Sequence, residues 1–167
     1  LAAFPAWSAL PQSERADCLI RLAHTIDEHA DHLALMDAVD AGIAVSGMRG
    51  DMDWTAKTLR YFAGLITEIK GESSSQGSRH LNIIRRQPYG VVAKINPFNH
   101  PFRFCAEKAA APLAAGNSVV IKQPEQAPLS GLRFAELTDG LFPPGVINVI
   151  TGDSVAGSAL VRHPDVH

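Results

Sequence analysis

The sequence predicts an α/β fold in which N-terminal helices are followed by a β-hairpin arm and an open, parallel, Rossmann-like βαβ sheet. No proline occurs between Pro11 and Pro88, so this stretch is free to form helices. From Val91 onward, short apolar runs alternate with helical patterns, which is typical of parallel strands covered by helices on both faces. With 167 residues, 46% of them hydrophobic, the chain can bury one ordinary core.

Helices are predicted for the first half. Apolar side chains recur at helical spacing at Leu19, Leu22, Ala23 and Ile26, and again at Leu59, Phe62, Ala63, Ile66 and Ile69. Pro11 suits the first turn of the first helix. Asp31 is a candidate N-cap for a second helix over residues 33–39, and Gly42 and Gly47 are expected to break the chain before a third helix near Asp51.

A flexible connection is predicted for residues 71–78, which hold four serines and two glycines. Residues 81–86 read as a strand. Gln87-Pro88-Tyr89-Gly90 then predicts a type I turn, because proline is favoured at its second position and glycine at its fourth.

The second half alternates regularly. Strands are predicted at residues 91–95, 118–122 and 146–150, and helices at 102–115, 129–138 and 154–161. Three strands are fewer than a typical sheet holds, and the chain stops at residues 165–167, where a fourth strand would begin. We therefore expect a truncated sheet, belonging to a longer protein.

Composition argues against several classes of function. A net charge of -2 and the lack of basic runs argue against a nucleic-acid partner. No apolar run approaches the roughly 20 residues of a membrane helix. Cys18 and Cys105 lie far apart without CxxC spacing, which fits a reducing, cytoplasmic compartment. His24, His29 and His32 are interpreted as part of a solvated polar face, so no metal site is expected.

Ligands of an open parallel sheet bind beyond the carboxyl ends of its strands. The residues there are Asn96-Pro97-Phe98-Asn99-His100-Pro101, Lys122-Gln123-Pro124-Glu125 and Thr151-Gly152-Asp153-Ser154. Neither GxGxxG nor a Walker A motif occurs, so a conventional dinucleotide fingerprint is absent.

These segments resemble the aldehyde dehydrogenase superfamily. The resemblance also includes Gln87 to Val92, Lys108 with Leu113 to Asn117, Pro128-Leu129, and Pro143 to Val149 followed by Thr151-Gly152. It implies NAD(P)-dependent oxidation of an aldehyde to a carboxylic acid, in which a cysteine forms a thiohemiacetal and then a thioester that a glutamate base helps to hydrolyse. NAD is the expected cofactor, with NADP possible, and a small aldehyde is the expected substrate.

The resemblance assigns catalytic roles to two residues. Asn99 matches the asparagine whose amide stabilises the oxyanion. A turn former is the alternative interpretation of an asparagine between two prolines. Lys108 matches a lysine near the active site that is sometimes assigned to a proton relay, and a snorkelling helix lysine is the alternative.

Cofactor binding is implied for the residues after each strand. Lys122 and Glu125 match the pair that binds the adenosine ribose, and the charge of Glu125 favours NAD by repelling a 2′-phosphate. A solvated ion pair is the alternative for these two. The other matching positions are Ile95, Asn96, Pro97, Phe98, Gly152 and Val155, while Phe98 and His100 are expected to line the substrate tunnel.

The resemblance divides the chain into a helical segment of the cofactor domain (residues 1–72), a loop and strand resembling the family's oligomerisation arm (73–90), and a partial cofactor-binding domain (91–167), with the catalytic domain absent. Strands within residues 81–95 are expected to form that arm, which implies a homo-oligomer, either a dimer or a tetramer. Gly116 is expected to serve a tight turn.

Neither cysteine stands in the family's nucleophile context, and both are interpreted as small buried apolar residues. The general-base glutamate also lies beyond residue 167 in the family's order, so the chain alone is expected to be inactive. Two alternatives remain open: an acylating semialdehyde dehydrogenase or related reductase of the same fold, and a non-catalytic nucleotide-binding or assembly module.

Overall fold

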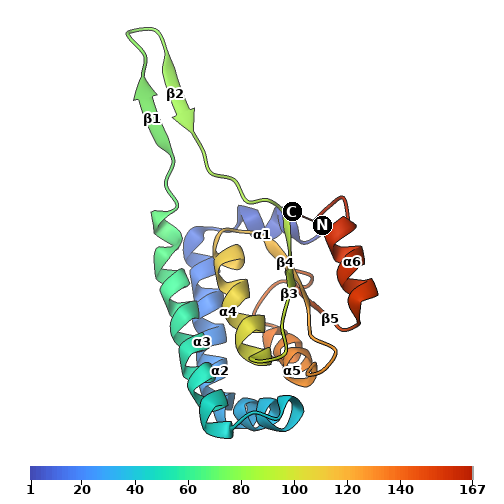
Figure 1. Ribbon diagram of the computed structural model, residues 1–167. Helices are drawn as coiled ribbons and strands as arrows, with labels where there is room; N and C mark the ends of the chain where they lie inside the picture. The colour runs from blue at the N-terminus through green and yellow to red at the C-terminus, as the bar shows by residue number, and fades with distance from the viewer. Residues whose placement is uncertain (167) are drawn as a thin grey trace.

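Three long helices pack beside a small parallel sheet, and a two-stranded arm projects from the body (Figure 1). The structure is a computed structural model that describes residues 1–166; His167, the last residue of the predicted 91–167 unit, lies outside the described residues. The helices are α1 (Phe4–Ala9), α2 (Gln12–Ala41), α3 (Val45–Leu65), α4 (Pro101–Ala114), α5 (Leu129–Thr138) and α6 (Ser154–Arg162), with a short 3-10 turn at Ile66–Glu68. The strands are β1 (Glu72–Ser75), β2 (Leu81–Ile84), β3 (Val91–Ile95), β4 (Ser118–Lys122) and β5 (Ile147–Ile150).

The N-terminal helices are longer than predicted. Helix α2 runs unbroken through Asp31, so the prediction of a new helix there is wrong. The exposed carboxylate of Asp31 instead pairs with Arg49 Nε at 2.6 Å, and buried Ala30, Leu33 and Ala34 continue the apolar stripe. Gly42, with φ of 70°, does end α2, as predicted. The short helix α1 has no counterpart in the prediction.

Helix α3 begins at Val45, so the expected break at Gly47 is also wrong. A side chain at Gly47 would meet nothing within 4 Å, which shows that the glycine occupies an open helix surface and serves no turn. Glycine inside a helix costs roughly 1 kcal/mol relative to alanine, a cost that the packing of α3 against α2 outweighs.

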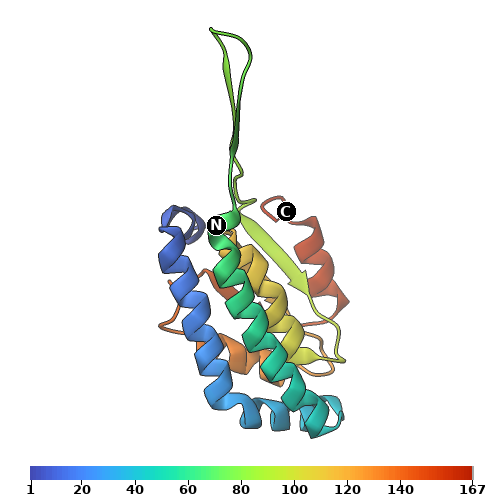
Figure 2. The same cartoon turned by 90° about the vertical axis from the view of Figure 1, so that its left-hand side faces the viewer.

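The arm differs from the prediction in its strands. β1 forms inside the segment that was expected to be a flexible connection, and it pairs antiparallel with β2 from Glu72 opposite Ile84 to Ser75 opposite Leu81. β3 belongs to the parallel sheet, so the arm is built from residues 72–84 and not from 81–95. Figure 2 shows the arm standing clear of the body.

The predicted type I turn at residues 87–90 is not formed. Gly90, with φ of 118°, donates its N–H to Asn117 Oδ1 at 3.0 Å, and not to the carbonyl of Gln87. Asn117 Nδ2 also donates to Pro112 O at 3.1 Å. Gly116 has φ of 90°, which confirms its predicted place in the turn between α4 and β4.

The parallel sheet is confirmed, with the order β3-β4-β5. Helices α4 and α5 connect consecutive strands and lie on one face together with α2 and α3, while α6 lies on the other face (Figure 1). After α6, Val166 forms a parallel bridge with Val91 on the free edge of β3. Because parallel crossovers are right-handed, this return to the opposite edge requires α6 to cross the opposite face. The arrangement is that of a doubly wound sheet.

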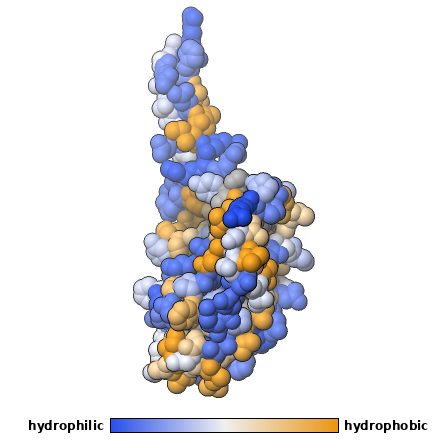
Figure 3. Space-filling view, turned by 45° about the vertical axis from the view of Figure 1, so that its right-hand side comes forward, coloured by the Kyte–Doolittle hydropathy of each residue, from blue (hydrophilic) through white to orange (hydrophobic). Residues whose placement is uncertain are grey.

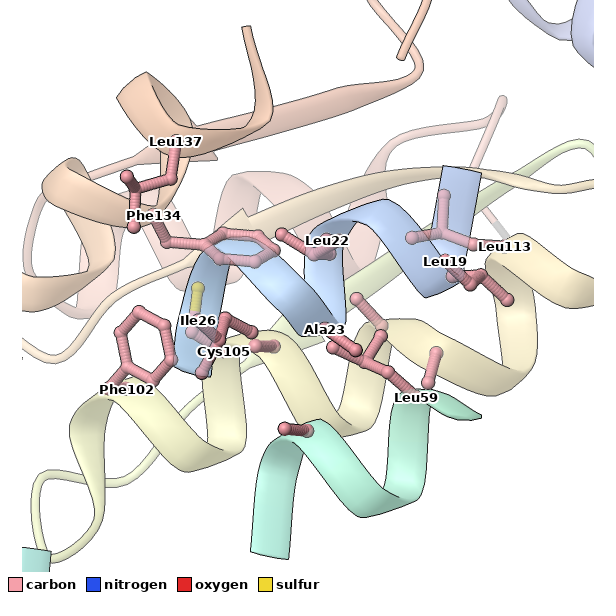
Figure 4. Close-up of a cluster of buried hydrophobic side chains, with 14 of the residues drawn as sticks. Leu19, Leu22, Ala23, Ile26, Leu59, Phe102, Cys105, Leu113, Phe134 and Leu137 are labelled. Carbon is pink, nitrogen blue, oxygen red and sulfur yellow. The ribbon is translucent and has the colours of Figure 1, made fainter. Parts of the chain in front are cut away.

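The core lies between the sheet and the long helices. Figure 4 shows Leu19, Leu22, Ala23 and Ile26 of α2 meeting Leu59 of α3, Phe102, Cys105 and Leu113 of α4, and Phe134 and Leu137 of α5. The rings of Phe102 and Phe134 pack edge to face with centroids 6.0 Å apart. The first run predicted from helical periodicity corresponds to the buried stripe of α2. Of the second run, Leu59 and Ala63 are buried on α3, but α3 ends at Leu65, so the prediction is wrong at Ile69, which lies beyond the helix and is 38% exposed.

Arg15 is a buried cation that joins three helix ends. Its Nη1 donates to Leu10 O (2.5 Å) and Ser8 O (3.3 Å), and its Nε donates to Ala114 O (3.4 Å). Burial lowers the pKa of its guanidinium. The carbonyls at helix C-termini carry partial negative charge, which suits a cation there.

We expect Arg15→Met to lower the free energy of unfolding by about 2–4 kcal/mol, since it removes charged hydrogen bonds and leaves buried carbonyls unpaired. Urea denaturation measures this change. Arg21→Met is the matched control, because Arg21 on the same helix is exposed and, within residues 1–166, donates to Leu141 O at 3.1 Å and to Cys18 Sγ at 3.3 Å. Equal effects of the two substitutions would contradict the assigned role of Arg15.

Within residues 1–166, no helix is both long enough and apolar enough to cross a membrane. Two of the α2 histidines contact other residues: His29 Nδ1 lies 2.9 Å from Thr25 O on the same helix, and His24 Nδ1 lies 3.4 Å from Arg60 Nη2 on α3. In the same range of the chain, no three potential metal-ligating side chains come together.

Candidate functional site

Three loops leave the parallel sheet at one edge, at the end of the body opposite the arm (Figure 1). β3 ends at Ile95, β4 at Lys122 and β5 at Ile150, and Lys122 is paired with both of the others. The ladder continues into the loops, because Asn96 N–H donates to Lys122 O at 3.1 Å and Gln123 N–H donates to Ile150 O at 2.9 Å. The structure thus brings the loops that carry the predicted cofactor residues to a common edge.

Lys122 is a buried cation at the centre of this edge, only 6% exposed. Its Nζ donates to Gln123 O at 3.0 Å, which uses one of its three donors. Helix α6 approaches it closely at Gly157, where an added Cβ would lie 3.8 Å from Lys122 Cδ and 3.7 Å from Ile95 Cδ1. The ammonium therefore retains donor capacity beside a closely packed helix.

Glu125 is exposed at the start of the loop after β4 and receives a hydrogen bond from Gln126 Nε2 at 3.4 Å. Among the described residues it forms no ion pair with Lys122, so the alternative interpretation of these residues as a solvated ion pair is wrong. The Lys122 ammonium and the Glu125 carboxylate are therefore both available to bind a ligand.

The loop after β3 combines a buried amide with exposed side chains. Asn96 is buried, and its Nδ2 has no hydrogen-bond partner among residues 1–166. Pro97, Phe98 and Asn99 follow on the surface, with Phe98 55% exposed. Buried donors are normally paired, so Asn96 Nδ2 marks this loop as a place where a polar partner is expected.

His100 is the N-cap residue of α4 and is held from two sides. Its Nδ1 donates to Asp51 Oδ2 at 2.5 Å, and its ring meets Phe104 edge to face at 5.5 Å. The imidazole is thereby tied to α3. The role of His100 in lining a substrate passage stays a prediction.

Lys108 lies on the surface of α4, farther along the helix from Asn99. Its Nζ donates to Glu107 Oε1 at 3.0 Å and stands 5.8 Å from the Phe104 ring centroid. Lys108 is the eighth residue after His100, which corresponds to a rise of about 12 Å along the helix. Burial lowers the pKa of Lys94 in β3, and the charge of Lys108 lowers it further. Lys94 was not singled out from the sequence. The signal that could have identified it is a single cation in an otherwise apolar strand.

Gly152 lies in the loop after β5, and Val155 lies in the first turn of α6. Gly152 has φ of 136°, and an added Cβ would stand 2.8 Å from Ala156 Cβ, so only glycine fits this turn. Val155 is 72% exposed, while its N–H donates to the capping side chain of Asp153 at 2.8 Å. Val155 therefore presents an apolar surface beside the carboxyl edge.

Both cysteines are buried and free, as interpreted from the sequence. Burial raises the pKa of the Cys105 thiol, which holds it in its neutral form. A neutral, buried thiol is a poor nucleophile, so Cys105 contributes packing.

Two buried carboxylates beside the loop were missed by sequence reasoning. Asp37 in α2 is 0% exposed and Asp51 in α3 is 6% exposed, and both contact the first turn of α4. The available signal was helical spacing, because Asp37 follows Leu33 and Ala34 on the buried stripe. The bend between α2 and α3 lies at the same end of the molecule as the loop after β3 (Figure 2).

Comparisons with known proteins agree along the whole chain. A family model described as "Aldehyde dehydrogenase family" matches residues 1–167. Aldehyde dehydrogenase tropH of Talaromyces stipitatus is 42% identical over 165 residues, which cover 97% of this chain and 32% of that protein. The chain therefore spans about a third of the length of the curated relatives it matches.

Solved structures show the same likeness. The crystal structure of PnpE in complex with nicotinamide adenine dinucleotide has a TM-score of 0.94 and 43% identity, covering 99% of this chain and 34% of that one. The crystal structure of PnpE from Pseudomonas sp. WBC-3 gives the same values. Glyceraldehyde-3-phosphate dehydrogenase GapN from Methanocaldococcus jannaschii, complexed with NADP, has a TM-score of 0.92 and 29% identity, with coverages of 99% and 38%.

Proposed function

Because this chain belongs to the aldehyde dehydrogenase family, we propose that it forms the front part of the cofactor-binding half of an enzyme that oxidises an aldehyde to a carboxylic acid. The observation that carries the proposal is Lys122, a buried ammonium with unused donors at the shared edge of three strands. That edge is where ligands of doubly wound sheets bind.

The residues at this edge fit a dinucleotide. Lys122 supplies donors and Glu125 supplies acceptors for the two hydroxyls of a ribose. Asn96 Nδ2 is a buried donor without a partner among residues 1–166, and Val155 offers apolar surface for a flat base. Relatives of the chain have been solved with NAD and with NADP. We assign NAD as the preferred cofactor, since the Glu125 carboxylate repels a 2′-phosphate.

When bound, NAD(P)⁺ supplies the hydride acceptor of the oxidation. The role proposed for Asn99 is to donate its side-chain amide to the oxygen that becomes negative as the aldehyde is attacked. Phe98 and His100 flank Asn99 and are assigned to the walls of the substrate passage. Lys108, which is paired with Glu107, is assigned to the outer part of a proton path.

The arm is proposed to join copies of the protein into a homo-oligomer. Leu81, Ile83 and Ile84 on β2 are 64%, 66% and 58% exposed, and apolar surface gathers along one side of the arm (Figure 3). Exposed apolar strands are unfavourable in water and are normally covered. A second copy of the chain would cover them.

The cofactor assignment predicts a selective effect of Glu125→Gln in the full-length enzyme that carries this segment. We expect the Kd for NAD⁺ to rise about 3- to 10-fold, because a charged acceptor for ribose hydroxyls is lost. The Kd for NADP⁺ should stay level or fall, because the repulsion of the 2′-phosphate is removed. Isothermal titration calorimetry measures both.

The matched control is Glu136→Gln, which changes an exposed glutamate of α5 that pairs with Arg133. It should leave both affinities within about twofold of the unsubstituted enzyme. Equal weakening of NAD⁺ and NADP⁺ by Glu125→Gln would reject the contact with the ribose.

A further inference from the structure

Asp51 is a nearly buried carboxylate that binds two side chains of a neighbouring helix. Its Oδ2 accepts from His100 Nδ1 at 2.5 Å and its Oδ1 accepts from Arg103 Nη1 at 3.2 Å. Only 9% of its side chain is exposed, whereas Asp53, two residues on, is 56% exposed and pairs with Arg49 on its own helix. Asp51 is thus built into a contact between α3 and α4.

This contact fixes the first turn of α4. His100 is the N-cap of the helix, and Arg103 lies in its first turn. Arg103 is itself fixed, because its Nε donates to Glu107 Oε2 at 2.7 Å and its guanidinium lies 5.3 Å from the Trp54 ring centroid. Charge-assisted bonds to a shielded carboxylate are stronger than neutral ones. Asp51 therefore holds both ends of the turn with strong bonds.

Asn99 directly precedes this turn and has no such support of its own. Its side chain is exposed, and within residues 1–166 it makes no hydrogen bond. The loop is tied at its start by the bond from Asn96 N–H to Lys122 O, and after Asn99 by His100 and by the bond from Phe102 N–H to Asp37 Oδ2 at 3.1 Å. The backbone that carries the Asn99 side chain is therefore held in place through its neighbours.

We propose that Asp51 is a positioning residue, which acts through His100 and Arg103 to fix the loop that presents the Asn99 amide to the reacting oxygen. The inference rests on the proposed function, because it takes Asn99 as the oxyanion donor. A donor must be held closely to the position of the developing charge, and a displacement of about 1 Å can cost roughly 100-fold in rate.

The test is a double-substitution cycle in the full-length enzyme, with kcat, KM and the Kd for NAD⁺ measured for Asp51→Ala, Asn99→Ala and the combination. We expect Asp51→Ala to lower kcat about 10- to 100-fold and to leave the Kd for NAD⁺ within about twofold. In the combination, kcat should be no more than about twofold below that of Asn99→Ala alone, because residues that act as a unit are not additive.

Two further variants separate positioning from folding. Asp53→Ala is the matched control on the same helix, and its kcat should stay within about twofold of the unsubstituted enzyme. Asparagine has nearly the same shape as aspartate and retains one acceptor oxygen. The kcat of Asp51→Asn should therefore lie between those of Asp51→Ala and the unsubstituted enzyme. If Asp51→Ala fails to fold, Asp51→Asn takes its place in the cycle.

The possible outcomes are distinguishable. Normal kcat for Asn99→Ala would overturn the oxyanion role proposed for Asn99, and this inference with it, but would leave the proposed cofactor site and reaction class standing. A lowered kcat for Asn99→Ala together with a normal kcat for Asp51→Ala would overturn this inference and leave the proposed role of Asn99 in place. A combined loss equal to the product of the single losses would also overturn it, because Asp51 would then act independently of Asn99. A kcat of the combined variant that stays within about twofold of that of Asn99→Ala alone would support the inference.

Discussion

Replacement of Asn99 by alanine should lower kcat of the full-length enzyme about 100- to 1,000-fold, the loss typical when one donor to an oxyanion is removed. The negative charge on the aldehyde oxygen exists only as the reaction proceeds, so a bond from the Asn99 amide, as proposed, would stabilise mainly the transition state. Substrate KM should change little.

The measurement is steady-state turnover together with the Kd for NAD⁺. The affinity for NAD⁺ should stay within about twofold, because removing Asn99 leaves the Lys122 and Glu125 groups in place. Asn99→Asp is the informative companion, since it preserves shape and removes the N–H donors. It should be as slow as Asn99→Ala.

Two results would contradict the role of Asn99. Unchanged kcat would show that the residue only shapes the turn between Pro97 and Pro101. Loss of NAD⁺ affinity in parallel with kcat would show that the loop collapses, and that the amide itself is not what the reaction needs. The bond networks of Asn96 and His100 on either side of Asn99 argue against such a collapse.

The sequence was sufficient to locate the edge of the sheet that carries the candidate site. Apolar runs at residues 91–95 and 118–122 define buried parallel strands, and the polar residues that follow them must leave at the same edge. Lys122 and Asn96 are found there because strand periodicity is a local property. Their loops were therefore predictable without tertiary information.

Local signals failed where a partner distant in the sequence decides the conformation. Asp31 looks like a helix cap, yet α2 continues through it because Ala30, Leu33 and Ala34 around it are buried against other helices. The serines of β1 have little strand propensity, and they are extended because Leu81 to Ile84 pair with them. The burial of Asp37 and Asp51 likewise depends on where α4 arrives.

Asp37 should make the protein less stable as the pH rises from about 4 to about 6. Burial is the main reason that its pKa is raised to about 6, with the charges of Asp51 and Asp40 adding to the effect, while Ser130 and the Phe102 N–H oppose it. A carboxyl whose pKa is higher in the folded state binds its proton more tightly there. Its contribution to stability is therefore fully present below the unfolded pKa and is lost as the pH passes through the folded one.

Over this pH range the free energy of unfolding is expected to fall by about 3 kcal/mol, because the pKa of Asp37 is raised by roughly two units and each unit corresponds to about 1.36 kcal/mol. Urea denaturation of the protein and of Asp37→Asn at pH 4, 5, 6 and 7 measures it, because asparagine still accepts from the Phe102 N–H but does not titrate. The difference between the two stability curves should fall with pH and level off above about pH 6.5. Asp53→Asn, an exposed aspartate of α3, should keep the slope of the unsubstituted protein. A parallel pair of curves for the protein and Asp37→Asn would show that Asp37 binds its proton equally tightly in the folded and unfolded states, and would contradict the raised pKa.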